Sequence, residues 1–170
     1  MKTKIFESHL HPALKQLHKN TSLWVGHIND DQPDHAAGQT FQCPDNGDLD
    51  EIQVYSIIVT RPGHMILTLH EFDKQNKQWG RPISSSEIEV DVNDADHWIK
   101  FPVSTTYLNK DLTYGFQIKS PDTMVALGEA AWPSKTPFEY GEEWSINDVE
   151  NEDHYYRYFS LAFKVALRAA

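Results

Sequence analysis

The chain has 170 residues, 39% of them hydrophobic and 12% aromatic, a composition typical of one globular domain rich in β-strand formers. Its 25 acidic and 15 basic residues give a net charge of -10. No cluster of lysine or arginine offsets that charge, so we expect no nucleic-acid partner. The single cysteine, Cys43, excludes an intramolecular disulfide, a zinc site built on thiolates and a redox pair.

The first nine residues begin basic but reach Glu7 and His9 before any apolar run develops, which argues against a secretory signal. No window of the sequence is apolar over the length of a membrane span. We therefore expect no membrane partner and a cytoplasmic location by default, or an extracellular one if the chain is a processed product.

One segment near the start has a helical pattern. Leu10, Ala13, Leu14 and Leu17 follow the spacing i, i+3, i+4, i+7, and Pro12 suits a first helical turn. Two turns are too short to be stable alone in water, so we expect this short N-terminal helix to dock on the rest of the protein.

We predict an N-terminal segment, residues 1–37, followed by one domain, residues 38–170, which we call the body. Residues 1–37 would hold the helix, a first strand near Leu23 and Val25 and a polar loop, all packing on a domain of residues 38–170. In the body, Ile52, Val54, Ser56 and Ile58 alternate with fairly apolar neighbours within residues 49–60, which predicts a central strand covered on both faces. Further strands are expected at residues 40–43, 65–70, 87–92, 98–103, 114–119 and 124–127.

The chain closes on a strictly alternating segment, residues 158–167. One face carries Phe159, Leu161, Phe163, Val165 and Leu167. The other face is small and almost uncharged, so we expect the N-terminal helix to cover it. About eight strands with turns near every tenth residue, and no helical period after residue 20, predict an all-β fold of two antiparallel sheets, a β-sandwich.

The order of these strand and turn patterns resembles a widespread bacterial jelly-roll domain, similar to the galactose-binding-like sandwiches and the carbohydrate-binding modules. The matching segments are residues 38–41, 47–54, 67–72, 98–101, 112–118 and 159–165. The resemblance implies a jelly-roll β-sandwich with carbohydrate as a partner. It also implies a structural calcium ion held by loop oxygens.

A long irregular stretch, residues 128–154, is the best candidate for a binding site, because loops over a rigid sandwich often carry function. It supplies aromatic rings on which sugars could stack and carboxylates that could accept hydroxyl hydrogen bonds. The ligand-binding residues that we predict are Trp132, Tyr140, Trp144, Glu129 and Glu142. The alternative is that the tryptophans only close the end of the sandwich and the glutamates are solvated.

Two stretches offer metal ligands. Asp45, Asp48 and Asp50 supply oxygen atoms at close spacing, which suits calcium, although aspartates in such a run also serve simply as turn residues. His27 and His35 flank a loop with three aspartates, where a histidine and aspartate site could assemble.

The sequence holds no nucleophile elbow, metalloprotease helix or phosphate-binding glycine loop, so we do not predict an enzyme. The function predicted is non-catalytic carbohydrate binding. One alternative is a structural or protein-protein interaction module that pairs with a partner or with itself as a homo-oligomer. Another is a glycoside hydrolase that uses two carboxylates from Glu129, Glu139, Glu142 and Glu143.

Overall fold

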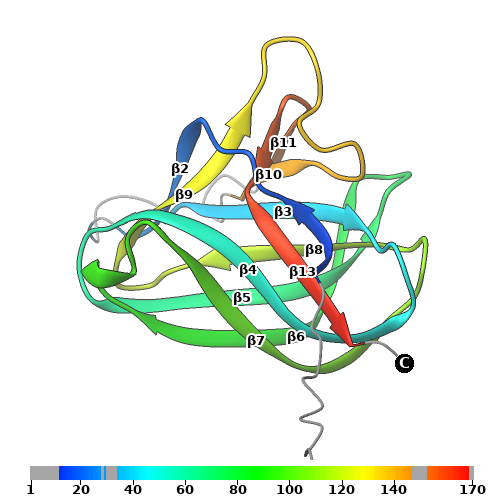
Figure 1. Ribbon diagram of the computed structural model, residues 1–170, viewed down its shortest axis with the longest axis horizontal. Coiled ribbons are helices and arrows are strands. Elements are labelled where there is room, and N and C mark those ends of the chain that lie inside the picture. Colours follow the sequence, from blue (N-terminus) through cyan, green and yellow to red (C-terminus); the bar gives the residue numbers. More distant parts are fainter. Residues whose placement is uncertain (1–11, 28, 30–33, 147–152, 169–170) are drawn as a thin grey trace, which may run out of the picture.

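The computed structural model describes residues 12–27, 29, 34–146 and 153–168 (Figure 1). Two antiparallel sheets pack face to face and account for almost all of its regular structure. The remaining regular element is a single 3₁₀ turn, η1 (Val92–Asp94). Within the described part of the chain, no helix has the length and apolar character needed to cross a membrane.

The first sheet has seven strands. Five follow one another in the order β1 (Pro12–Gln16), β13 (Phe163–Arg168), β4 (Gly47–Val59), β9 (Met124–Ala131) and β12 (Phe159–Leu161). Two more strands join this path: β7 (His97–Leu108) pairs with β4, and β2 (Thr21–Gly26) pairs with β9. The long β4 strand therefore has three partners, which confirms its predicted central place.

The second sheet has six strands, in the order β11 (His154–Tyr156), β10 (Glu143–Ile146), β3 (Ala36–Gln42), β8 (Thr113–Lys119), β5 (Gly63–Asp73) and β6 (Gln78–Val90). The two-sheet antiparallel sandwich is thus confirmed. It holds thirteen described strands, more than the eight or so expected. The difference arises from short strands such as β10, β11 and β12, whose three or four residues carry too little alternation to be recognised in a sequence.

Aromatic rings from both sheets fill the core. Phe163 on β13 contacts Phe41 on β3, Phe116 on β8 and Phe138 from the loop after β9, with ring centroids 5.1 to 6.4 Å apart. All four rings are buried. Such tilted and edge-to-face contacts add to the hydrophobic stabilisation of the sandwich.

The central strand β4 departs from its expected alternation at one point. A register shift between Ser56 and Ile58 turns Ile58 outward, where it is 44% exposed, and buries Val59 instead. A β-bulge of this kind reverses the two faces of a strand. The opposite face of β4 is not fully covered as predicted, because Gln53 and Tyr55 are only half-buried.

The predicted N-terminal helix is wrong where it can be tested. Residues 12–16 form the strand β1, which pairs with β13 so that Leu14 lies opposite Val165, while Leu10 lies outside the described residues. A short amphipathic helix gains little by itself, whereas β13 offers a full row of backbone hydrogen-bonding groups at the sheet edge. Since β1 lies beside β13 in the same sheet, it is not a helix that covers the outward face of the closing segment.

The closing segment forms two strands in place of one. β12 pairs with β9 and β13 with β4, and between them the Ala162 N–H donates to the Gly128 carbonyl at 2.9 Å. Leu161 and Phe163 are buried, as the alternation predicts, but Ser160 and Ala162 on the expected outer row are buried as well.

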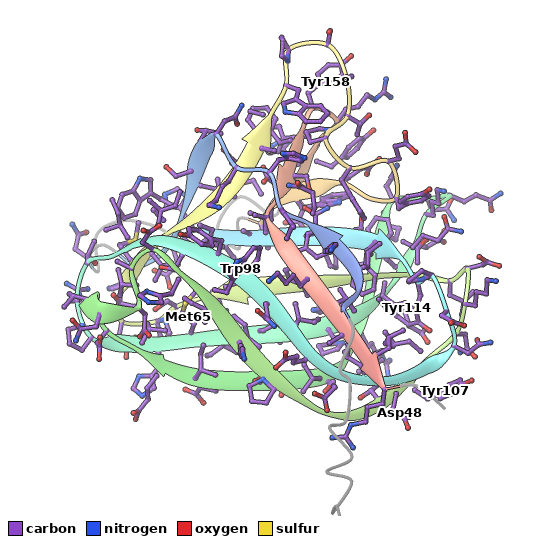
Figure 2. The ribbon with its side chains drawn as sticks, viewed as in Figure 1. Asp48, Met65, Trp98, Tyr107, Tyr114 and Tyr158 are labelled. Atoms are coloured by element: carbon purple, nitrogen blue, oxygen red, sulfur yellow. The ribbon has the colours of Figure 1, made fainter. Side chains whose placement is uncertain are left out.

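Outside the core, Trp98 on β7 is half-buried on the outer face of the first sheet, where Figure 2 labels it. It lies opposite Tyr55 in the register of β4 and β7, and the Lys164 Nζ lies 4.1 Å from its ring centroid. Its outward direction follows from its place next to the buried Ile99, because successive side chains of a strand point to opposite faces.

Candidate functional site

A pocket lies at the end of the sandwich where the chain passes from β9 to β10. It has a volume of about 210 Å³, and two segments contribute most of its lining: the loop of residues 132–142 and the tip of the β5–β6 hairpin, residues 74–77. The charged and aromatic side chains of its lining are Phe72, Lys74, Lys77, Glu139, Tyr140, Glu142 and Arg157. Figure 1 shows the loop rising above β9, β10 and β11.

The pocket side of the loop is fixed to β3 by backbone hydrogen bonds. The Gln42 N–H donates to the Tyr140 carbonyl at 2.8 Å, and the Thr40 N–H donates to the Glu142 carbonyl at 2.9 Å. Gly141 between them has no room for a side chain, because a Cβ there would lie 1.8 Å from the Thr40 carbonyl oxygen. The sequence Tyr140–Gly141–Glu142 can therefore follow β3 closely while its two side chains reach the pocket.

Glu142 is held firmly in the pocket lining. Its N–H donates to the Thr40 Oγ1 at 2.8 Å, and its Oε1 accepts from the Lys77 Nζ at 2.5 Å. The same Nζ lies 4.9 Å from the ring centroid of Tyr155, a cation–π distance. Lys77 thus links the hairpin tip to both the loop and strand β11.

An aromatic groove adjoins the pocket and shares Lys77 with it. Its volume is about 480 Å³, and its lining includes Trp79, Trp144 and Tyr155. The Trp79 ring lies over Gly115, where a Cβ would approach it to 2.5 Å, so this glycine makes space for the indole on the outer face of the second sheet. Trp79 and Trp144 contact edge to face at 5.7 Å, and their buried indole N–H groups have no hydrogen-bond partner among the described residues.

Two buried glutamates lie behind the loop. Glu129 on β9 is 4% exposed and Glu143, the first residue of β10, is 2% exposed. Their carboxyl groups hydrogen-bond to each other across the two sheets. Burial, together with the neighbouring Glu129, raises the pKa of Glu143 to about 10, and burial also raises the pKa of Glu129. At neutral pH the pair therefore retains at least one proton.

The surroundings of this carboxyl pair are polar but uncharged. Gln39 lies beside Glu143 in the second sheet, and its Oε1 accepts from the Leu161 N–H of the first sheet at 3.0 Å. One oxygen of each glutamate, Oε2 of Glu129 and Oε1 of Glu143, has no hydrogen-bond partner within the described part of the chain. Since the loop of residues 132–142 begins just after Glu129 and ends just before Glu143, the pair ties its two ends together.

The structure brings together only part of the predicted binding set. Tyr140, which is 56% exposed, and Glu142 both line the pocket. Trp144 lines the adjoining groove but is 3% exposed, so it offers little ring surface for stacking. Glu129 lies between the sheets, and Trp132 lies apart, with the His18 ring 6.0 Å from its own and the Lys135 Nζ at 4.7 Å.

The hydrolase alternative gains no support from the buried pair. A retaining or inverting glycosidase needs two carboxyl groups separated by about 5 Å or more, with the substrate between them. Glu129 and Glu143 instead hydrogen-bond directly to one another, and both are almost fully buried.

The sequence interpretation missed the cationic side of the pocket. Lys74 and Lys77 belong to the hairpin tip and Arg157 to the turn after β11. A polar hairpin tip indicates only a turn, and more than fifty residues separate it from the loop of residues 132–142. The pairing of β3 with both β8 and β10 is what brings the two segments to the same end of the sheet.

The predicted metal ligands make other contacts. Asp50 accepts from the Arg168 guanidinium at 2.7 Å, and the Asp45 side chain accepts from the Asn46 N–H at 2.8 Å. Calcium at Asp45, Asp48 and Asp50 stays a prediction. Across the described residues, no three histidine, cysteine, aspartate or glutamate side chains are grouped so that they could hold a metal ion.

The histidine and aspartate hypothesis finds one of its contacts. The His27 Nδ1 and the Asp34 Oδ1 lie 2.5 Å apart, while His35 pairs with Gly26 through main-chain atoms. This contact brings one histidine and one aspartate of that loop together.

No protein-family model and no curated protein sequence matches the chain. Among solved structures, the fold is similar to the crystal structure of the cysteine protease and lectin-like domains of Cwp84, a surface layer associated protein of Clostridium difficile, with a TM-score of 0.54 and 9% identity. The match covers 80% of this chain and 32% of that one, so this protein spans about a third of its neighbour. At this identity the likeness shows a shared fold.

Proposed function

We propose that this protein is a non-catalytic carbohydrate-binding β-sandwich of jelly-roll type, and that its ligand binds in the pocket between residues 132–142 and the β5–β6 hairpin. The observation that carries the proposal is the lining of this pocket. An exposed ring, Tyr140, lies there beside the carboxylates of Glu139 and Glu142 and the Lys77 ammonium.

These groups match the two needs of sugar recognition. The apolar face of a sugar ring packs on an aromatic side chain, and its hydroxyls exchange hydrogen bonds with charged and polar groups. Glu142 suits the second need because Lys77 and Thr40 already hold it in place, so little side-chain entropy is lost when a ligand binds.

Two further points support the proposal. The neighbouring solved structure includes a lectin-like domain, and its likeness covers most of this chain. Loops grafted on one end of a sandwich are also a common location for ligand sites, since the sheets beneath keep them rigid.

The test is a glycan array followed by titration calorimetry on the full chain. Tyr140→Ala should weaken binding of any glycan detected by tenfold or more, because the stacking surface is lost. Tyr107→Ala is the matched control: Tyr107 on β7, labelled in Figure 2, is also 56% exposed but is not among the residues that line the pocket. Absence of glycan binding, or equal losses for both variants, would refute the proposal.

A further inference from the structure

The pocket is lined by cationic side chains in a strongly acidic protein. Only 15 of the 170 residues are lysine or arginine, and the net charge is -10. Three of these fifteen line this pocket: Lys74 and Lys77 from the hairpin tip and Arg157 from the turn after β11. Residues from two distant parts of the chain therefore bring positive charge to the same place.

Part of this positive charge is already compensated. Lys77 donates to Glu142 at 2.5 Å, which leaves Lys74, Arg157 and Glu139 as the other charged groups of the lining. Among the described residues, the side chains of Lys74 and Arg157 form neither an ion pair nor a hydrogen bond. The pocket lining thus holds two uncompensated cations and a single uncompensated carboxylate.

This balance favours a negatively charged ligand group. The repulsion expected between an anion and a protein of charge -10 is reduced locally where two cationic residues line the same pocket. Arginine recognises the shape of an anion as well as its charge, because its planar guanidinium can donate two parallel hydrogen bonds to a carboxylate or sulfate. Lysine contributes a compact charge that adapts its position on a flexible stem.

The pocket has room for one sugar unit, and the adjoining groove could take a second unit linked to it. A volume of about 210 Å³ lies below the roughly 300 Å³ at which pockets for drug-sized ligands begin. The adjoining groove of about 480 Å³ shares Lys77 with the pocket, and its lining includes the aromatic residues Trp79 and Tyr155. A second sugar unit could extend from the pocket along this groove.

We propose, on the basis of the function proposed above, that the pocket binds a sugar unit carrying an anionic group, with that group between Lys74 and Arg157. Tyr140 packs on the sugar ring and Glu139 accepts hydrogen bonds from its hydroxyls. The anionic group is a carboxylate, as in a uronic acid, or a sulfate ester, and the two are separated by the choice of probe.

The test compares matched trisaccharides by titration calorimetry with the full chain. The probes are galacturonic acid trimers, the same trimers after reduction of their carboxyl groups to alcohols, and sulfated galactose trimers. We expect at least one anionic probe to bind tenfold or more tightly than the reduced trimer at 50 mM NaCl, with this preference falling at 500 mM because the attraction is screened.

Two double variants locate the effect. Lys74→Gln with Arg157→Gln should abolish the preference for the anionic probe. Lys110→Gln with Arg81→Gln is the control, because it removes the same total charge at two exposed sites outside the pocket and should keep the preference. Circular dichroism of each variant confirms that it is folded.

The outcomes separate the two proposals. If the reduced trimer binds as tightly as both anionic probes, or if both double variants lose the preference equally, the anionic assignment is wrong while carbohydrate binding stands. If no trimer and no glycan of the array binds, the proposed function fails together with this inference.

Discussion

The pair of buried carboxyl groups behind the loop makes the stability of this protein depend on pH. The pKa of Glu143 is about 10 in the folded protein, against about 4.5 for an ordinary glutamate, because burial and Glu129 disfavour its charged form. Between these two values the folded state holds a proton that the unfolded chain has released. The free energy of unfolding therefore falls as pH rises through this range.

The size of the effect follows from one proton. Each pH unit within the range costs about 1.4 kcal/mol of stability per retained proton. Glu143→Gln removes this cost, since an amide of nearly the same shape is neutral in both states. From pH 5 to pH 8 the stability of the variant relative to the natural protein should therefore rise by up to about 4 kcal/mol.

The assay is urea unfolding at pH 5, 6, 7 and 8, followed by tryptophan fluorescence. Glu139→Gln is the control, because Glu139 lies exposed on the same loop and its substitution should leave the pH profile unchanged. If the Glu143→Gln profile ran parallel to that of the natural protein, Glu143 would be ionised in the folded state and the reasoning would be refuted.

Three further predictions concern packing, loop attachment and one surface histidine. Phe163→Ala should lower the free energy of unfolding by about 3 to 5 kcal/mol in urea denaturation, because it leaves a cavity among three other phenylalanine rings; a loss below about 1 kcal/mol would contradict this packing. Gly141→Ala should cost about 1 to 3 kcal/mol in thermal unfolding and displace the loop, since the new Cβ meets the Thr40 carbonyl, and unchanged stability would exclude this close approach. The side chain of Asp122 accepts a hydrogen bond from the His64 ring, which raises the pKa of His64, so Asp122→Asn should lower the midpoint of the His64 titration followed by NMR; an unaltered midpoint would show that the pair does not form in solution.

Periodicity in the sequence correctly predicted the class of fold. The alternation in residues 49–60 and 159–167 indicates which face of each strand is buried. This pattern can be recognised in the sequence even when the neighbouring strands are unknown. Two of the departures from expectation arose from contacts between strands that are distant in the sequence. A helix was predicted at residues 10–17, but residues 12–16 form a strand because they pair with the edge of β13. The bulge after Ser56 changed which side chains of β4 are buried.

The candidate site was predicted in part for a similar reason. Aromatic and acidic composition drew attention to residues 128–154, and Tyr140 and Glu142 of that stretch do line a pocket. Composition could not show that Glu142 and Glu143 have different surroundings, because the two residues are identical and adjacent. Successive residues near a strand start face opposite ways, which sends one carboxylate to the pocket and the other between the sheets.

The sequence by itself determined an acidic, all-β protein with a long loop of aromatic and acidic residues before its last strands. These properties depend on composition and on periodicity along the chain, and both are local. Only the tertiary structure brought Lys74, Lys77 and Arg157 to that loop and joined Glu129 to Glu143 across the two sheets. Such contacts arise from the order in which strands pair, which depends on the free energy of the whole sandwich and leaves no pattern in any one segment.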